Sequence, residues 1–264
     1  MRTHRWRCPS PSPRRSTPRS PATRAPYISD GATLQTGIGS IPSAIARQLA
    51  AGDGSGYGIH SEMFTDGLMH LHTAGKVANR KGLYDGVSVA TFAMGSEDLY
   101  RWLHENEEVA FLPVEIVNAP EVIGRNRDMI TINGALGVDV HGQVVADTIA
   151  GVQHSGVGGQ EDFIAGPGLS LSQRSLLCLP STYATAEGEA RSTIVPWFDA
   201  GAVITTPRHQ VDIVVTEHGA AELEGRTVHQ RGEALAAVAH PDFRDELREA
   251  AARASRGNSP RPPG

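Results

Sequence analysis

Glu62 is the residue in this sequence whose setting is best suited to chemistry. It lies in the short polar segment 58–67 (GIHSEMFTDG), and the seven residues 52–58 that lead into it contain four glycines. Glycine at this density is incompatible with a helix interior, so we expect the carboxylate to project from a loop or a strand end into a cavity. A carboxylate placed in this way can attack an activated acyl group. The alternative is an ordinary exposed acid at a turn or helix start, because such acids are common.

The patterns typical of several other active sites are missing. The sequence has no G-x-S-x-G nucleophile elbow, no G-x-x-x-x-G-K-[ST] phosphate loop and no H-E-x-x-H zinc motif. His70 and His72 are spaced like a metal pair, but no carboxylate–histidine set at ligand spacing accompanies them, so we predict no metal site. Glu217 ends the apolar run 213–216 and is the competing carboxylate, for which we favour structural bonding of the strand end.

The charge of the chain is unevenly distributed. The net charge is −5, but residues 1–26 hold seven of the 24 basic residues and no acid, which leaves 17 basic against 29 acidic residues, or −12, in the remainder. An acidic body argues against nucleic acid as a partner. No apolar run approaches the roughly 18 residues of a membrane-spanning helix, so no membrane contact is predicted. Two cysteines make no disulfide framework, which favours the reducing cytoplasm, and Cys178 is expected to be a small buried hydrophobe.

A strand, a glycine turn and a helix are expected before Glu62. Residues 32–36 read as the strand, residues 37–42 as the turn, and residues 43–51 as the helix, with Ser40 or Ser43 as its cap. Such a turn could present backbone N–H groups to an anion or an acyl oxygen. It is not the dinucleotide-binding fingerprint, because Pro42 stands where the third glycine belongs.

Strands and helices alternate along the rest of the chain. The pattern predicts strands at 87–94, 111–117, 129–136, 202–206 and 211–217, a hairpin turn at His141–Gly142, and helices at 96–106, 220–223, 228–239 and 243–253. This alternation favours a mixed α/β sheet. We divide the chain into a disordered Arg/Pro/Ser-rich tail at 1–31, a catalytic domain at 32–254 and a disordered tail at 255–264.

Several short motifs, each weak alone, jointly resemble the acetyl-CoA hydrolase/transferase family, which includes acetate and 4-hydroxybutyrate CoA-transferases. They follow the family's order over about residues 32–250, which correspond to its C-terminal half. The matching segments are 34–42 (LQTGIGSIP), 58–63 (GIHSEM), 66–67 (DG), 113–118 (PVEIVN), 142–144 (GQV), 155–160 (SGVGGQ), 162–163 (DF), 215–219 (VTEHG) and 231–244 (RGEALAAVAHPDFR).

The resemblance implies a fold, a reaction and a role for each matching position. The fold would be the CoA-transferase-like (NagB/RpiA/CoA transferase-like) open sheet with helices on its faces. The reaction would be CoA transfer from an acyl-CoA to a short-chain carboxylate, a ping-pong reaction through a glutamyl-CoA thioester on Glu62, without a metal or a permanently bound cofactor. Asn118 would be a side-chain donor to the oxyanion. Backbone or CoA-binding roles would fall to Gly37, Ile38, Gly39, Ser40, Ile41, Gly158 and Gly159.

One departure from the family concerns the first of its two similar domains, which has no counterpart here. We interpret residues 1–26 as translated sequence upstream of the true coding frame, or as the result of a truncated gene. The chain would then be a homo-oligomer, or would pair with a second polypeptide that supplies the other half. The alternatives are hydrolysis of acetyl-CoA and an inactive fragment.

Overall fold

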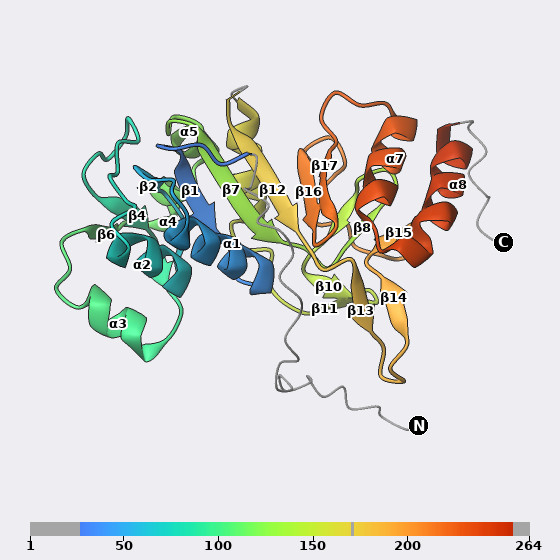
Figure 1. Ribbon diagram of the computed structural model, residues 1–264, viewed down its shortest axis with the longest axis horizontal. Helices are drawn as coiled ribbons and strands as arrows, with labels where there is room; N and C mark the ends of the chain where they lie inside the picture. Colours follow the sequence, from blue (N-terminus) through green and yellow to red (C-terminus); the bar gives the residue numbers. More distant parts are fainter. Residues whose placement is uncertain (1–26, 170–171, 256–264) are drawn as a thin grey trace.

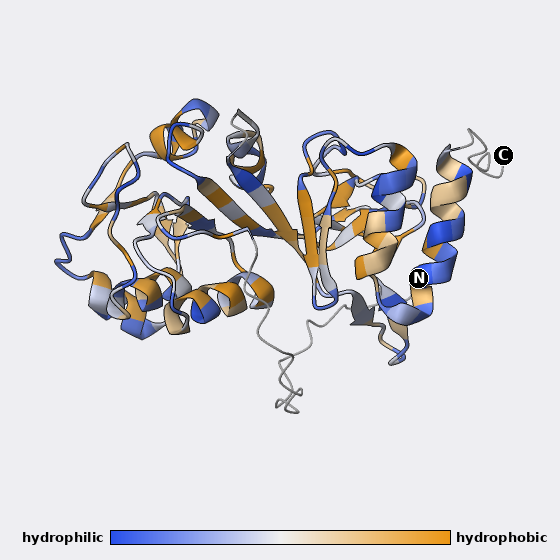
Figure 2. Ribbon diagram, turned by 45° about the horizontal axis from the view of Figure 1, so that its top comes forward, coloured by the Kyte–Doolittle hydropathy of each residue, from blue (hydrophilic) through white to orange (hydrophobic). Residues whose placement is uncertain are grey.

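The computed structural model describes residues 27–169 and 172–255. Its centre is a six-stranded sheet in the order β17-β16-β12-β7-β1-β2 (Figure 1). All neighbouring strands are parallel except β16 and β17, which are antiparallel. Figure 2 shows that the long central strands are hydrophobic along much of their length, as expected for parallel strands covered on both faces. The strands are β1 (Thr33–Thr36), β2 (Gly58–Ile59), β7 (Met129–Gly134), β12 (Arg174–Cys178), β16 (Ile213–Thr216) and β17 (Gly219–Glu222).

Helices cover both faces of this sheet. Successive residues of β7 belong to different apolar clusters, because side chains alternate across a strand. Ile130 packs with Leu34 and Leu68, on the face of α1 (Ser40–Ala51) and α2 (Asp66–Thr73). Met129 packs with residues of α4 (Val114–Val117), α5 (Pro120–Ile123) and α6 (Gln160–Ala165). A third cluster joins β16 to α7 (Val228–Val238) and α8 (Arg244–Ser255), which lie side by side at the red end of the chain (Figure 1).

Short elements complete the described chain. They are β3 (Met63–Phe64), β4 (Ser88–Ala90), β5 (Phe92–Ala93), α3 (Glu97–Leu103), β6 (Val109–Phe111), β8 (Gly137–Asp139), β9 (Val144–Val145), β10 (Thr148–Ile149), β11 (Val152–Gln153), the 3₁₀ turn η1 (Pro167–Leu169), β13 (Thr182–Ala184), β14 (Ala190–Ser192), β15 (Ile194–Val195) and the 3₁₀ turn η2 (Pro241–Phe243). In the described residues, no helix is both long and apolar enough to cross a membrane.

The strand order reverses direction between β1 and β7. From β1 the chain moves outward to β2, and later it returns to β7 on the other side of β1 before continuing to β12 and β16. In open α/β sheets, ligands bind outside the carboxyl ends of the strands at such a switch point. Gly37 follows β1 at this edge, and a Cβ added to Gly134 at the end of β7 would lie 3.4 Å from the Ile38 carbonyl. Glu62 follows β2 on the same edge.

Predictions that depend on the residue types of one short segment, such as a turn or a helix cap, were confirmed. Residues 32–36 contain β1, and the predicted hairpin is the antiparallel pair β8 and β9. Gly142 in its turn has φ +87°, a backbone conformation that favours glycine. The Ser96 hydroxyl accepts the Leu99 N–H and caps α3.

Four local predictions were wrong. The predicted strand at 111–117 ends at Phe111 in β6, and residues 114–117 form the short helix α4 after Pro113. Residues 220–223 belong mainly to β17, because pairing with β16 overrides their helical propensity. Residues 202–206 form no strand, and Val203 is 47% exposed, so this apolar run is not buried in the sheet. Helix α1 begins at Ser40 after Gly39, and neither predicted serine caps it.

The ends of the chain lie partly outside the described residues. The predicted tails at 1–31 and 255–264 are described only from Tyr27 to Gly31 and at Ser255. The Tyr27 hydroxyl donates to Glu222 Oε1 at 2.9 Å, and Tyr27 and Ile28 pack half-buried against the core. The segment just before β1 is therefore attached to the folded domain.

Candidate active site

Glu62 lies between β2 and β3, with its backbone held by a neighbouring segment. Its carbonyl accepts the N–H groups of Thr91 at 2.8 Å and Phe92 at 3.2 Å. Its half-buried side chain accepts the Gly159 N–H at Oε2, at 3.0 Å. The carboxylate is thus anchored through one oxygen, in the loop between two short strands where the sequence predicted it.

Gly159 is the residue on which the site converges. It precedes α6 with φ −83° and ψ 10°, a conformation open to any residue. A Cβ at this position would collide with Asn118 Nδ2 and would lie 2.5 Å from Glu62 Oε2, whereas real Cβ atoms keep at least 3.0 Å. Only glycine therefore lets residues 62, 118 and 159 meet. The preceding Gly158 has φ +61° and is also close to Glu62, since its added Cβ would lie 3.9 Å from Oε2.

Asn118 ends α4 and turns its amide toward the same point. The residue is only 7% exposed, and its Nδ2 donates a long hydrogen bond of 3.4 Å to Asp162 Oδ2 in α6. Its Oδ1 is buried and has no partner among the described residues. The structure therefore brings Glu62, Asn118 and Gly159 together from distant positions of the sequence, and their roles in catalysis remain predictions.

The predicted donors of residues 37–41 are arranged differently. The Gly37 N–H donates to the Ile132 carbonyl at 2.8 Å, so it already takes part in the sheet and is not free to stabilise an oxyanion. In the described chain, no hydrogen bond joins residues 37–41 to Glu62. Gly37, Ile38 and Gly39 instead line an open cavity of about 250 Å³ together with residues 65–67, immediately beyond β3. A substrate-binding role for Gly37, Ile38, Gly39, Ser40 and Ile41 remains a prediction.

His60 is a buried part of this region that the sequence did not single out. Its ring is fully buried two residues before Glu62, and Nε2 lies 2.8 Å from the Val117 carbonyl. Burial lowers the pKa of His60 to about 4, only partly opposed by the hydrogen bond to Val117 and reinforced by the charge of Lys81. The imidazole is therefore neutral at physiological pH.

This buried imidazole should make the fold acid-sensitive. Its pKa falls from 6.5 to about 4 on folding, so between these values the unfolded chain binds a proton that the folded chain does not. The contribution of the buried neutral His60 ring to the free energy of unfolding is complete above pH 6.5, and it is lost as the pH falls toward 4. We therefore expect the free energy of unfolding of wild type, measured with urea, to fall between pH 7 and pH 5 by about 2 kcal/mol more than that of His60→Gln. Equal losses in the two proteins would contradict this assignment.

Two other candidates from the sequence have structural roles here. Glu217 accepts the Ser181 N–H at 2.9 Å and the Ser181 hydroxyl, and although burial raises its pKa, these bonds lower it overall. The predicted structural role of Glu217 is confirmed. His72 packs against the stacked rings of Phe64 and Trp102 and bonds Ser88, while His70 is exposed. Cys178 is buried as predicted, which raises the pKa of its thiol to about 12.

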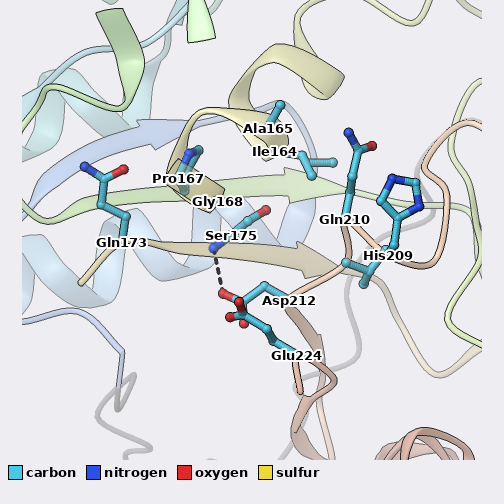
Figure 3. A pocket seen from close by; sticks show the side chains of 11 residues that line it. Ile164, Ala165, Pro167, Gly168, Gln173, Ser175, His209, Gln210, Asp212 and Glu224 are labelled. Carbon is cyan, nitrogen blue, oxygen red and sulfur yellow. Dashed lines mark hydrogen bonds between the residues drawn. The ribbon is translucent and has the colours of Figure 1, made fainter. Parts of the chain in front are cut away.

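A larger open cavity of about 350 Å³ lies away from Glu62 (Figure 3). It is at the amino ends of β12 and β16, where the Ser175 N–H donates to Asp212 Oδ2 at 3.1 Å. Its lining residues are Ile164, Ala165, Pro167, Gly168, Gln173, Ser175, His209, Gln210, Val211, Asp212 and Glu224. Glu62, Asn118 and Gly159 do not line it, and it faces the opposite edge of the sheet. Cavity size alone would therefore point away from Glu62.

Taken residue by residue, the site offers an anchored carboxylate, an amide donor and a glycine loop. Within residues 27–169 and 172–255, no group of three or more His, Cys, Asp or Glu side chains is placed to hold a metal ion. Carboxylate, amide and backbone N–H groups are those needed for nucleophilic acyl chemistry with an oxyanion intermediate.

Known proteins have sequences similar to this chain. A model of the acetyl-CoA hydrolase/transferase C-terminal domain matches residues 95–251, which include Asn118 and Gly159 but begin after Glu62. The 4-hydroxybutyrate coenzyme A transferase of Clostridium kluyveri is 46% identical over 224 residues, or 84% of this chain and 51% of that protein. The chain spans about half the length of the curated relatives it matches.

Solved structures agree with the sequence match. RipA from Yersinia pestis is 37% identical with a TM-score of 0.79, covering 90% of this chain and 55% of that one. The 4-hydroxybutyrate CoA-transferase from Porphyromonas gingivalis is 39% identical with a TM-score of 0.73, covering 87% of this chain and 53% of that one. The predicted α/β, CoA-transferase-like fold is thereby confirmed.

Proposed function

Because the chain belongs to the acetyl-CoA hydrolase/transferase family, we propose that it carries the nucleophile for CoA transfer from an acyl-CoA to a short-chain carboxylate. The observation that carries this proposal is the convergence of Glu62 and Asn118 on Gly159, where an added Cβ would collide with both side chains.

The proposed reaction exchanges groups on Glu62 without a net proton transfer. A Glu62 oxygen attacks the thioester carbonyl, the C–S bond breaks, and CoA leaves as the thiolate with an acyl-glutamyl anhydride on the enzyme. The thiolate then attacks the glutamyl carbonyl, which releases the acyl group as a carboxylate and leaves a glutamyl-CoA thioester. The second carboxylate attacks this thioester, and the same two steps in reverse produce the new acyl-CoA and free Glu62.

The hydrogen bond from Gly159 suits Glu62 to this role. It anchors Oε2 at 3.0 Å, and we propose that Oε1 is the attacking oxygen. The nucleophilic form of a carboxylate is the charged one. We propose that acyl-CoA binds through the glycine loop at Gly158 and Gly159, and that it also contacts residues 37–41, of which Gly37, Ile38 and Gly39 line the cavity beyond β3.

Asn118 is the proposed donor to the oxyanion of each tetrahedral intermediate. Among the described residues, its Nδ2 makes one long bond of 3.4 Å, to Asp162, so its hydrogen-bonding capacity is not exhausted there. We expect Asn118→Ala to lower kcat by about 10²-fold, the typical effect of removing one such donor. Steady-state kinetics checks this, with circular dichroism to establish that the variant is folded. A change in KM alone would assign Asn118 to ground-state binding.

We also propose that the site is completed by a second polypeptide, either another copy or a chain that corresponds to the other half of the relatives. Three apolar residues in the segments that adjoin Glu62 and Asn118 remain exposed, namely Phe92, Val114 and Ile116, at 36–46%. The N–H of Phe92 bonds the Glu62 carbonyl, and Val114 and Ile116 lie on the helix that ends at Asn118. Exposed apolar groups gathered at a site mark a surface suited to a partner.

Mass spectrometry tests the proposed function directly. Purified protein is incubated with acetyl-CoA and then treated with hydroxylamine or borohydride, each of which converts an activated glutamyl carbonyl into a product of altered mass. We expect modification at Glu62, with none in Glu62→Gln. An unmodified Glu62 in folded protein, also after addition of a candidate partner chain, would refute the nucleophile assignment. Loss of acetyl-CoA without transfer to a carboxylate would favour hydrolysis.

A further inference from the structure

One buried ring connects the three segments that form the proposed site. His60 lies in the strand segment that leads to Glu62, and its Nε2 is 2.8 Å from the carbonyl of Val117, the residue before Asn118. The same ring lies 6.2 Å, centroid to centroid, from Phe163 in α6, the helix that Gly159 precedes. We infer that His60 is a positioning residue that fixes Asn118 relative to Glu62. This inference rests on the proposed function for its effect on catalysis.

The direction of the hydrogen bond excludes a catalytic role for the ring itself. A carbonyl can only accept, so Nε2 carries the proton and donates it to Val117, which leaves Nδ1 as a bare acceptor. Nδ1 is buried and has no partner among the described residues, and the whole side chain is 0% exposed. The ring therefore has no route to an acyl-CoA and cannot exchange protons with it.

The Val117 carbonyl depends on this donor. It stands at the end of α4, where helical carbonyls have no N–H partner within the helix. Within the described chain, no backbone N–H donates to it, and Val117 is itself fully buried. Without His60 the end of α4 would have to move to satisfy this carbonyl, and Asn118 would move with it. Displacement of a catalytic group by about 1 Å can cost about 10²-fold in rate.

A matched pair of substitutions separates the donor from the ring. The amide of Gln reaches the position of Nε2 and can still donate to Val117, whereas the shorter Asn reaches only the position of Nδ1. We expect His60→Asn to lower kcat by about 10²-fold with a smaller change in KM, and His60→Gln to stay within about tenfold of wild type. In an Asn118→Ala background, His60→Asn should lower kcat by no more than about twofold further, because the two residues act as one unit.

A readout that needs no activity keeps the inference separate from the proposed function. In two-dimensional NMR spectra, the side-chain amide resonance of Asn118 should shift or broaden in His60→Asn and return toward its wild-type position in His60→Gln. If the Asn118 resonance changes in this way among the variants but wild type transfers no CoA, the proposed function fails and the positioning role stands. An unchanged Asn118 resonance in a folded His60→Asn, or fully multiplicative kcat losses in the double variant, would overturn the positioning role.

Discussion

Glu62→Gln is expected to lower kcat for CoA transfer by at least about 10³-fold while the protein remains folded. An amide has no charged oxygen to attack the thioester, so neither the anhydride nor the glutamyl-CoA thioester can form. The amide oxygen of Gln can still accept the Gly159 N–H that Glu62 accepts at 3.0 Å, so the local structure should persist. Transfer is measured with acetyl-CoA and a short-chain carboxylate, and folding is measured by thermal unfolding.

Two further variants make this prediction specific. Glu62→Asp keeps the charge but withdraws it by one methylene from Gly159, so its activity should fall between wild type and Glu62→Gln. Glu121→Gln removes an exposed carboxylate on α5 and should leave kcat unchanged. Activity that survives in Glu62→Gln and is lost in Glu217→Gln would transfer the nucleophile role to Glu217, against its hydrogen bonding to Ser181.

Sequence patterns located the proposed nucleophile because local chemistry decides its setting. Four glycines in residues 52–58 exclude a helix there, and the structure places Glu62 in the loop after β2. The motif around Asn118 and the cluster at Gly158 and Gly159 likewise marked segments that meet in space. The glycines carry these signals because they permit backbone conformations and close approaches that a residue with a Cβ does not.

Other parts of the site depend on pairing across the fold, which a single sequence does not encode locally. The sequence predicted the Gly37 N–H as a donor to an acyl oxygen. Because β7 pairs with β1, this N–H instead donates to the Ile132 carbonyl. Residues 220–223 have a helical composition, but residues 219–222 pair with the free edge of β16 and form the strand β17. The role of His60 could not be predicted from the sequence, since its partner Val117 is 57 residues away. Its position beside Glu62 in an otherwise apolar strand segment was the one available hint.

The second large effect is expected from Gly159→Ala. The backbone at this position, φ −83° and ψ 10°, suits alanine, so any damage must come from the added methyl group. That methyl would collide with Asn118 Nδ2 and stand 2.5 Å from Glu62 Oε2, so it must push the two side chains apart. We expect kcat to fall by at least about 10²-fold, because the nucleophile and the donor no longer share one geometry. Stability should fall by about 1–3 kcal/mol, as in other overpacked sites.

Two controls separate this steric effect from the general effect of replacing a glycine by alanine. Gly168→Ala adds the same methyl where no atom lies within 4 Å, so it should leave activity and stability near wild type. In an Asn118→Ala background, the stability cost of Gly159→Ala should shrink, because the nearest colliding atom is gone. Urea unfolding of the four proteins in this cycle measures the difference. If Gly159→Ala destabilises the protein equally in both backgrounds, its methyl group does not press against Asn118. The convergence on Gly159 would then lose its main support.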